Sequence, residues 1–326
     1  MLITRTPLRI TLGGGGTDLP SYYREHGGMV LSAAISKHIY ISINQTFTDD
    51  YFLKYSALER VKHVEEISHP IIREILRAHD IGPAVEIVST ADIPAGTGLG
   101  SSGAFTVGML KAVHAVQRAH VSAADLGREA CEIEIDRLGR ASGKQDQYIA
   151  AFGGITRFDF RCDGTVDVIP TLISTETIHD LGEHLLMFFT GYSRDADHVL
   201  SEQKSRSERG DAQMIDNLHV VKELGIRSVA ALEAGRTDEF GELMHEHWQH
   251  KKQRSASMSN PGIDSLYEVG IANGARGGKL VGAGAGGFLM FYADDARRLR
   301  AAMRGEGLIE LRFGFDHGGS TVLVRE

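Results

Sequence analysis

A glycine- and serine-rich string in the first third of the chain has the composition of a phosphate-binding loop. It reads IPAGTGLGSSGA from Ile93 to Ala104 and runs into a segment, 101–119, with the length and composition of a helix. Glycines adopt backbone angles that let successive N–H groups point at one anion, and a helix N-terminus adds about half a positive charge. The string therefore predicts triphosphate binding without a Walker lysine. A glycine-rich turn capped by its two serines is the structural alternative.

Two further glycine clusters, 13–16 and 274–287, lie toward the two ends of the chain. With the first string they hold most of the excess of glycine, which makes up 38 of 326 residues, where about 7% is typical. The string Gly282-Ala-Gly284-Ala-Gly286-Gly287 matches the dinucleotide pattern GxGxxG, but the apolar residues 288–292 after it continue as a strand rather than opening a helix. No P-loop string GxxxxGK[ST] occurs. We therefore expect the C-terminal cluster to join two strands.

Three motifs, in this order, resemble those of the GHMP kinases, the family of galacto-, homoserine, mevalonate and phosphomevalonate kinases. They are Thr6-Pro7-Leu8-Arg9 with Thr17-Asp18, then Pro94-x-x-x-Gly98-Leu99-Gly100-Ser101-Ser102-Gly103-Ala104, then Lys279-Leu-Val-Gly282-Ala-Gly284-Ala-Gly286-Gly287-Phe288. The third motif departs modestly, with Ala285 where glycines are usual. The resemblance implies an α+β fold of two domains. Residues 1–178 would form an N-terminal domain with a left-handed βαβ crossover, and residues 179–326 a ferredoxin-like C-terminal domain.

The resemblance also implies a cleft for ATP and Mg²⁺. Residues implied to bind ATP belong to the second motif: Pro94, Gly96, Gly98, Leu99, Gly100, Ser101, Ser102 and Gly103. Ser102 and Glu134 are the implied metal ligands, and a hydroxyl with a carboxylate suits a hard cation. Taken by itself, Glu134 lies among other acidic residues and reads as an ordinary solvated helix carboxylate.

The string Ser142–Tyr148 resembles the family segment with the catalytic aspartate, which implies that Asp146 accepts the proton of the acceptor hydroxyl or orients that hydroxyl. Arg9 corresponds to an arginine of the first motif that lies near this carboxylate in related kinases. From residue type alone it reads as a strand-surface arginine.

Gly15 and Gly16 stand where galactokinases carry Glu-His, which leaves room for a larger sugar. Strings at 13–23, 27–37, 143–148, 152–154 and 189–194 resemble family members that phosphorylate the anomeric hydroxyl of D-glycero-α-D-manno-heptose 7-phosphate on the route to GDP-heptose. The substrate-binding residues so implied are Gly15, Gly16, Thr17, Asp18, Lys37 and Arg194. Lys144 and His26 are further candidates for the distal phosphate.

Two alternatives stay open. The first is a 1-kinase for another sugar, such as fucose or an N-acetylhexosamine. The second is a non-catalytic sugar or nucleotide sensor, which has no need for Ser102, Glu134 and Asp146 together.

The string His245-Glu-His247-Trp248-Gln-His250 suggests a metal site, but residues 245 and 247 face different sides of a helix and HExxH is absent. We expect a polar helix face here. Because Trp248 and the following Lys251-Lys252 resemble a segment of the heptose-specific kinases, this segment is a candidate for the acceptor pocket.

These motifs must be positioned by a mixed pattern of strands and helices. Expected strands are 2–12, 40–47, 85–90, 152–160, 185–189, 279–281, 288–292, 308–313 and 320–324. Expected helices are 21–27, 70–79, 101–119, 122–138, 195–209, 212–234, 237–252, 261–273 and 294–304.

The bulk composition is that of a globular protein with ordinary apolar and charged content. A net charge of −8 argues against a broad nucleic-acid surface, although local devices can still bind phosphates. No apolar run reaches the roughly 18 residues of a membrane span. Cys131 and Cys162 form neither a disulfide framework nor a metal motif, so we expect a cytoplasmic protein. The resemblance implies that it binds ATP and a sugar phosphate, and we expect a monomer or a homodimer.

Overall fold

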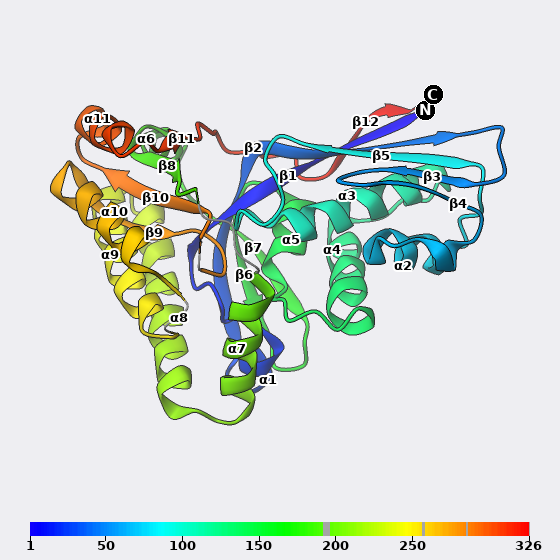
Figure 1. Cartoon of the computed structure of the whole chain (residues 1–326). Helices are drawn as coiled ribbons and strands as arrows, with labels where there is room; N and C mark the ends of the chain where they lie inside the picture. Colours follow the sequence, from blue (N-terminus) through cyan, green and yellow to red (C-terminus); the bar gives the residue numbers. More distant parts are fainter. Residues whose placement is uncertain (192–195, 256–257, 285, 326) are drawn as a thin grey trace.

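The computed structural model describes residues 1–191, 196–255, 258–284 and 286–325, which form two sheets and the helices around them (Figure 1). The larger sheet has eight strands in the order β12-β1-β2-β5-β3-β4, and β6 and β7 extend it from β2. Its strands are β1 (Leu2–Gly13), β2 (Gly28–Gln45), β3 (Tyr51–Lys54), β4 (Leu58–Val61), β5 (Val85–Ala91), β6 (Ile155–Phe160), β7 (Val166–Pro170) and β12 (Thr321–Arg325).

Strand β2 is the longest of this sheet and organises it. It pairs with β1 along most of its length, while its other edge pairs with β6 at residues 28–33 and with β5 at residues 39–45. The sequence predicts a strand only from Tyr40. The earlier part, GMVLSAAI, is buried on both faces and so shows no alternation of apolar and polar residues.

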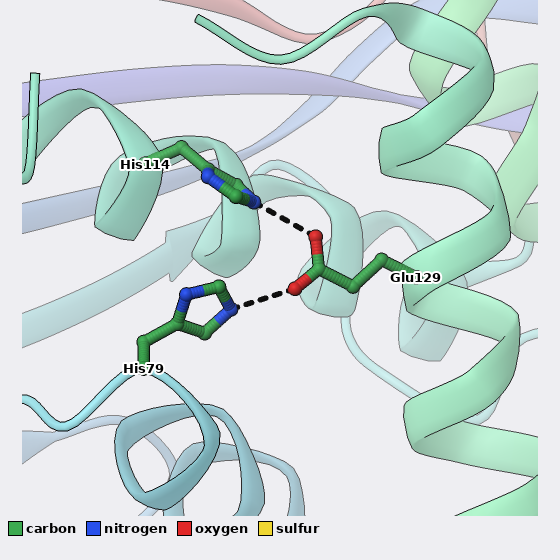
Figure 2. Close-up of side chains that lie close together, drawn as sticks. All are labelled: His79, His114 and Glu129. Atoms are coloured by element: carbon green, nitrogen blue, oxygen red, sulfur yellow. Dashed lines mark hydrogen bonds and ion pairs between the residues drawn. The ribbon is translucent and has the colours of Figure 1, made fainter. Parts of the chain in front are cut away.

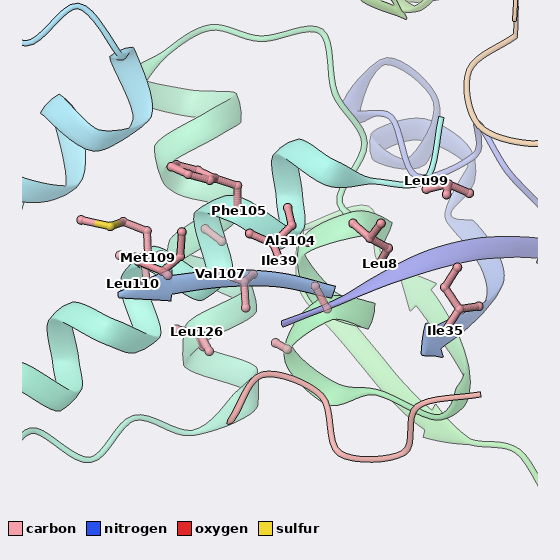
Figure 3. Packing of buried hydrophobic residues seen from close by; sticks show 14 of the residues in the cluster. Leu8, Ile35, Ile39, Leu99, Ala104, Phe105, Val107, Met109, Leu110 and Leu126 are labelled. Atoms are coloured by element: carbon pink, nitrogen blue, oxygen red, sulfur yellow. The ribbon is translucent and has the colours of Figure 1, made fainter. Parts of the chain in front are cut away.

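Helices α3 (Ser101–Val116) and α5 (Gln145–Phe152) pack on β1 and β2, with α4 (Ala123–Cys131) against both helices (Figure 1). Helix α3 is buried on nearly every side, and Phe105, Val107 and Leu110 lie in one apolar cluster with Leu8 and Ile39 of the sheet (Figure 3). Burying each such side chain stabilises the fold by about 1.5–3 kcal/mol. This packing fixes the N-terminus of α3, where the glycine–serine string ends.

Shorter elements complete this part of the chain. They are α1 (Pro20–His26), the 3-10 helix η1 (Val64–Glu66), α2 (Pro70–Ala78) and the π-helical turn η2 (Glu132–Arg137). The sequence predicts one helix over 122–138, whereas α4 ends at Cys131 and continues as the π-turn. Helix α5 is not predicted, and the strand expected from Phe152 begins at Ile155 because Gly153 and Gly154, both at positive φ, end the helix.

The smaller sheet has four antiparallel strands in the order β11-β8-β10-β9. They are β8 (Leu185–Phe189), β9 (Ala275–Leu280), β10 (Phe288–Ala293) and β11 (Ile309–Glu310). Its chain order, first strand between the fourth and the third, is that of the predicted ferredoxin-like domain. The helices are α6 (Thr175–His184), α7 (Ala196–Glu208), α8 (Ala212–Glu233), α9 (Thr237–Lys252), α10 (Pro261–Ala272) and α11 (Ala296–Gly305).

The last strand, β12, does not stay with the smaller sheet. It pairs with β1 at the edge of the larger sheet, and Phe315 bridges Ile35 of β2, so both termini lie together (Figure 1). This placement corrects the assignment of the final residues to the second domain: the tail returns to supply an edge partner for β1. The division near residue 178 and the hand of the crossover that joins the parallel pair β3 and β5 remain predictions.

Candidate active site

A cavity of about 660 Å³ lies where the three glycine strings meet. Gly15 and Gly16 border one side, Gly96, Gly98 and Gly100 another, and Gly282 a third. The larger sheet supplies Arg9 and Thr11 from β1. The smaller sheet supplies Lys279 from β9, and helix α9 adds residues beside it. The cavity therefore collects residues from both sheets.

The glycine–serine string forms a loop of unusual backbone conformation at the N-terminus of α3. Gly96, Gly98 and Gly100 have φ values of 77°, 84° and 73°, and Gly100 is the N-cap of α3. Ser101 and Ser102 follow in the first turn and also line the cavity. Positive φ values and a helix N-terminus together make an anion-binding concavity, which suits the phosphates of a nucleotide.

The C-terminal glycine string supports this loop from behind. A Cβ at Gly98 would lie 2.8 Å from the carbonyl oxygen of Val281, and one at Gly282 would lie 2.5 Å from the carbonyl oxygen of Gly98. Strands β9 and β10 flank the string as an antiparallel pair. The predicted strand–loop–strand arrangement is confirmed, and the helix that a dinucleotide-binding loop requires is replaced by β10.

Ser102 and Glu134 form a hydroxyl–carboxylate pair on the cavity wall. The Ser102 hydroxyl donates to Glu134 Oε2 at 2.6 Å, and Arg140 Nη1 lies 2.6 Å from Ser102 Oγ and 3.3 Å from Glu134 Oε2. A guanidinium held between the two oxygens shows that the pair attracts a cation. Hydroxyl and carboxylate oxygens are also ligands that Mg²⁺ accepts, so the donor set fits a divalent ion.

Glu134 is not a solvated helix carboxylate. The residue is 1% exposed, and Thr106 and Gln147 donate to its second oxygen at 2.8 Å and 3.2 Å. Burial raises the pKa of this carboxyl, and the hydrogen bonds from Ser102 and Thr106 and the charge of Arg140 oppose that rise. It lies on the π-turn η2, a kind of irregularity that is frequent at functional sites.

Arg9 and Asp146 form a bidentate ion pair beside the phosphate loop. Arg9 Nε and Nη2 donate to the two Asp146 oxygens at 2.7 Å and 3.0 Å, while Arg9 Nη1 donates to the carbonyl oxygen of Gly98 at 2.6 Å. A Cβ at Gly103 would lie 2.7 Å from Asp146 Cβ, so the helix can approach the carboxylate only with glycine there. The pair is therefore held rigidly between the loop and the first turn of α5.

Asp18 is the centre of a second polar group next to this pair. Its oxygens accept from the backbone N–H groups of Gly16 and Gln145, both at 3.1 Å, and from Gln145 Nε2 at 3.3 Å. Burial raises its pKa, the Gln145 N–H opposes this, and the charge of Asp146 adds to the rise. A Cβ at Gly143 would overlap the Asp18 carboxylate. The oxygens of Asp18 thus face the cavity in a fixed orientation.

An aromatic group borders the cavity at the donor end, beyond the phosphate loop. The rings of Tyr55, His69 and Phe105 follow one another at centroid distances of 4.8 Å and 4.9 Å. Burial lowers the pKa of His69, and the charge of Arg140 adds to this, so the ring is held neutral at physiological pH. A neutral, partly apolar wall of this kind suits a nucleobase.

The opposite wall carries four buried basic side chains, which we call the basic cluster: His247, Lys251, Arg254 and Lys279. Each is less than 7% exposed. Burial lowers the pKa of His247 and of Lys251 well below their ordinary values, that of Lys279 to about 7 and that of Arg254 to about 10. The expected polar helix face holds for residues 245, 246, 249 and 250, which are partly exposed, but not for His247 and Trp248, which are buried.

Most residues implied by the resemblance line this cavity. They are Arg9, Gly15, Gly16, Asp18, Gly96, Gly98, Gly100, Ser101, Ser102, Glu134 and Asp146. Leu99 is buried in the core and Gly103 packs on Asp146, so they support the site from behind. Pro94 accepts a hydrogen bond from Thr97 and does not line the cavity.

Four implied acceptor residues lie elsewhere. Thr17 is fully buried, and its hydroxyl joins the carbonyl oxygens of Gly14 and Met29 at 2.9 Å and 2.8 Å. Lys37 and His26 do not line the cavity, and Lys144 donates to the Gly164 carbonyl at 2.6 Å. Arg194 lies outside the described residues.

Other cavity residues were not foreseen. Gln145 and Arg140 bind the predicted carboxylates and serine, and Thr11 donates to Gln145 Oε1 at 2.6 Å. Arg254 carries no pattern that distinguishes it from a surface residue, and the strings that contain His247 and Lys279 did not assign them a role as ligands. Lys251 had a signal, since it follows Trp248 in the segment considered for the acceptor pocket.

A separate cluster of titratable side chains lies away from the cavity, where α2, α3 and α4 meet (Figure 2). His79 Nε2 and His114 Nε2 each lie 2.7 Å from one oxygen of Glu129. Burial raises the pKa of Glu129, but the hydrogen bonds from the two histidines outweigh it and hold that pKa at about 2. Because the Nε2 atom of each histidine is already hydrogen-bonded to the carboxylate, the cluster is a clamp between helices.

Comparison with known proteins finds two family models along the chain. The GHMP kinases N terminal domain matches residues 60–154, and the GHMP kinases C terminal domain matches residues 228–308. No helix in the described part of the chain has both the length and the apolar character needed to span a bilayer.

Individual relatives agree with these matches. D-glycero-alpha-D-manno-heptose 7-phosphate kinase of Campylobacter jejuni is 29% identical over 323 residues, which cover 94% of each chain. The bifunctional fucokinase/GDP-fucose pyrophosphorylase of Arabidopsis thaliana is 27% identical, over 90% of this chain and 30% of that longer one. A solved D-glycero-D-manno-heptose 1-phosphate kinase from Bacteroides thetaiotaomicron superposes with a TM-score of 0.82 at 25% identity, over the whole of both chains.

Proposed function

Because this chain belongs to the GHMP kinase family and is a sugar kinase, we propose that it phosphorylates the anomeric hydroxyl of D-glycero-α-D-manno-heptose 7-phosphate with ATP. The product would be the 1,7-bisphosphate, for GDP-heptose synthesis. The observation that carries the proposal is the Arg9–Asp146 pair, which lies between the phosphate loop and Asp18. At that point an acceptor hydroxyl would meet the transferred phosphoryl group.

On this proposal the donor end binds ATP through backbone and aromatic groups. The N–H groups of the phosphate loop and the N-terminus of α3 would hold the phosphates, and Tyr55, His69 and Phe105 would border the base. Ser102 and Glu134 would hold Mg²⁺, with Arg140 moving aside. When bound, the ion supplies positive charge to the phosphate oxygens as the phosphoryl group is transferred.

Asp146 would accept the proton of the anomeric hydroxyl or fix its orientation as it attacks. Two hydrogen bonds from Arg9 keep the carboxylate plane in place, which is the advantage of a bidentate arginine over a single charge. Asp18 would accept hydrogen bonds from sugar hydroxyls, since the acceptor-facing oxygens are already oriented by Gln145 and Gly16. In phosphoryl transfer, residues of this kind accept the proton of the acceptor hydroxyl or orient that hydroxyl for attack.

A coupled assay of ADP release with a panel of sugars tests the proposal. Turnover with the heptose 7-phosphate and weak or no turnover with free hexoses is expected. Turnover with fucose or an N-acetylhexosamine but not with the heptose phosphate would assign that sugar as the acceptor in place of the heptose phosphate. Fucose is the second candidate, because one relative is a fucokinase. ATP binding without turnover of any sugar would instead indicate a sensor.

A further inference from the structure

We infer that the basic cluster is a binding subsite for a phosphate group that the sugar acceptor carries, with Arg254 as its main ligand and Lys251 and Lys279 beside it. The inference rests on the proposed function and adds to it the residues that recognise the second anionic group. Lys37, Lys144 and His26, which the resemblance suggested for the distal phosphate, do not line the cavity, whereas Lys251, from the segment considered for the acceptor pocket, belongs to the cluster.

The basic cluster has no acidic partner among the described residues. Among the residues that the structure describes, no carboxylate lies within ion-pair distance of Lys251, Arg254 or Lys279, although all three are nearly fully buried. Of the described carboxylates, Asp18 alone acts on Arg254 through its charge, and it already accepts three hydrogen bonds. Buried charges are normally paired, so a cavity wall with unpaired cations is suited to a charged ligand.

Arg254 has donors to spare and is aimed at the acceptor end. Its Nε donates to Asn217 Oδ1 at 2.9 Å, whereas its Nη2 is buried with no partner in the described residues. A Cβ at Gly16 would lie 2.6 Å from Arg254 Nη1, so glycine there keeps the edge of the guanidinium open. A planar fork of two nitrogens matches two oxygens of a phosphate.

The two lysines complete the wall. Lys251 Nζ donates to the carbonyl oxygens of Leu280 and Gly282 at 2.9 Å and 2.5 Å, and Lys279 Nζ donates to that of Leu12 at 2.7 Å. An ammonium has three protons, so each lysine keeps at least one for a ligand. A bound phosphate would stabilise their charged forms, and we therefore expect proton uptake on binding.

The cluster serves the acceptor rather than ATP because the donor end has its own cationic and backbone groups. Arg140 lies at the Ser102–Glu134 pair, and the phosphate loop supplies N–H groups there. Arg254, by contrast, neighbours Gly16 and Asp18.

Steady-state kinetics on the full chain test the inference, with the heptose 7-phosphate and the same heptose without its phosphate as acceptors. Arg254→Gln should raise the KM for the phosphorylated acceptor about 100-fold, leave the KM for ATP within about threefold, and affect the unphosphorylated sugar by a much smaller factor. Inorganic phosphate should compete with the phosphorylated acceptor on the wild type and lose that effect on Arg254→Gln. Arg254→Lys should restore part of the loss, because it keeps the charge without the fork.

Lys251→Gln and Lys252→Gln form a matched pair. Lys251 lines the cavity, whereas Lys252 forms an ion pair with Asp264 at 3.6 Å and lies outside it, so only the first should weaken acceptor binding. Calorimetry in two buffers of different ionisation heat should show proton uptake with the phosphorylated acceptor. That uptake should diminish in Lys279→Met.

A rise in the KM for ATP, or an equal loss with both acceptors, would overturn the inference while leaving the kinase function in place. If the wild type turns over no sugar, the proposed function fails, and calorimetry with inorganic phosphate decides the subsite instead. Equal phosphate binding by the wild type and Arg254→Gln would then refute it. If circular dichroism shows that Arg254→Gln does not fold, the KM values for the two acceptors are compared in Arg254→Lys and Lys279→Met instead.

Discussion

The donor and acceptor ends of the cavity are built in different ways. The donor end consists largely of one continuous string, residues 96–102, whose backbone angles and helix N-terminus create the binding surface. The acceptor end is assembled from side chains that are far apart in the sequence, Asp18 after β1, Arg254 after α9 and Lys279 on β9. A site made of backbone depends on glycines at fixed places, whereas a site made of side chains depends on how two sheets pack together.

This difference has an electrostatic consequence. The donor loop presents backbone N–H dipoles, which do not titrate. The basic cluster holds cations out of water, and burial lowers the pKa of Lys279 to about 7. The acceptor end therefore responds to pH and to its ligand, and the donor end should respond much less.

Asp146, where the two ends meet, gives the largest expected effect. Asp146→Asn should lower kcat about 10²- to 10⁴-fold, because the amide can neither accept the hydroxyl proton nor pair with Arg9. ATP binding, measured by calorimetry, should be close to that of the wild type. Asp136→Asn is the control, since Asp136 is exposed on η2 and does not line the cavity. More than half of the wild-type kcat in Asp146→Asn would show that Asp146 has no catalytic role.

Two glycine substitutions should separate the ends. Gly98→Ala forces a side chain onto φ +84° and toward the Val281 carbonyl, so it should raise the KM for ATP about 10- to 100-fold. Gly143→Ala displaces the Asp18 carboxylate and should raise the KM of the acceptor to a similar degree. Gly182→Ala, where a Cβ meets no atom within 4 Å, is the control for both. If each variant changed both KM values equally, the two ends would not be separable.

The same contrast explains how much of the fold and of the site can be predicted from the sequence. The phosphate loop, the strand–loop–strand at 279–292 and most long helices follow from local patterns of glycine, apolar period and capping residues. Helix α5 has no such signal, because Lys144 offers no side-chain cap and five consecutive residues of the eight, from Gln147 to Ala151, are buried, so polar and apolar residues do not alternate with a helical period. The return of β12 to β1 is a long-range pairing that no local pattern contains.

The acceptor side of the cavity could not be predicted from the sequence for the same physical reason. His247 and Arg254 have the residue types of a solvated surface, and only the packing of α9 against β9 and the larger sheet turns them inward. Glu134 shows the opposite case: its neighbours suggest a solvated carboxylate, whereas the family motif places it in the site and the structure buries it. Burial of a charged side chain is decided by tertiary contacts, which sequence patterns report only through resemblance.

The pH dependence of acceptor binding sharpens the comparison further. The groups around Lys279 are His247 and Lys251 of α9, Arg254 and Arg9. Burial, with Arg254 and Arg9, lowers the pKa of Lys279 to about 7, so this lysine loses its proton above that pH in the free protein. The KM of a phosphorylated acceptor should therefore rise about tenfold between pH 7 and 8.5, while the KM for ATP stays nearly constant.

Stability should move in the other direction over this range. The unfolded chain keeps the Lys279 proton up to about pH 10.4, so it binds more protons than the folded chain above pH 7, and the free energy of unfolding rises with pH. Lys279→Met should remove part of both trends, as measured by kinetics and by urea unfolding at several pH values. A flat acceptor KM in the wild type would mean that Lys279 does not contact the phosphate.

The Glu129 clamp belongs to neither end and should give the smallest effect on activity. Glu129→Gln removes the charge that accepts hydrogen bonds from His79 and His114, and should lower the free energy of unfolding by about 1–3 kcal/mol. Both KM values should stay within about twofold of wild type. Glu132→Gln breaks an ion pair with Arg137 whose side chains are each 42% exposed, and should cost less than about 1 kcal/mol.

The sign of the pH effect identifies the clamp. The pKa of Glu129 is about 2 in the folded protein and near 4.3 when unfolded, so its stabilisation is complete above about pH 5 and is lost as the pH falls toward 2. The difference between wild type and Glu129→Gln in urea unfolding should therefore be full at pH 6 and shrink below pH 4. A difference that persisted unchanged at pH 3 would mean that packing, and not the charge of Glu129, holds α2, α3 and α4 together. A kinetic defect at either end of the cavity would instead show that the clamp is coupled to the site through α3, whose N-terminus forms the donor loop.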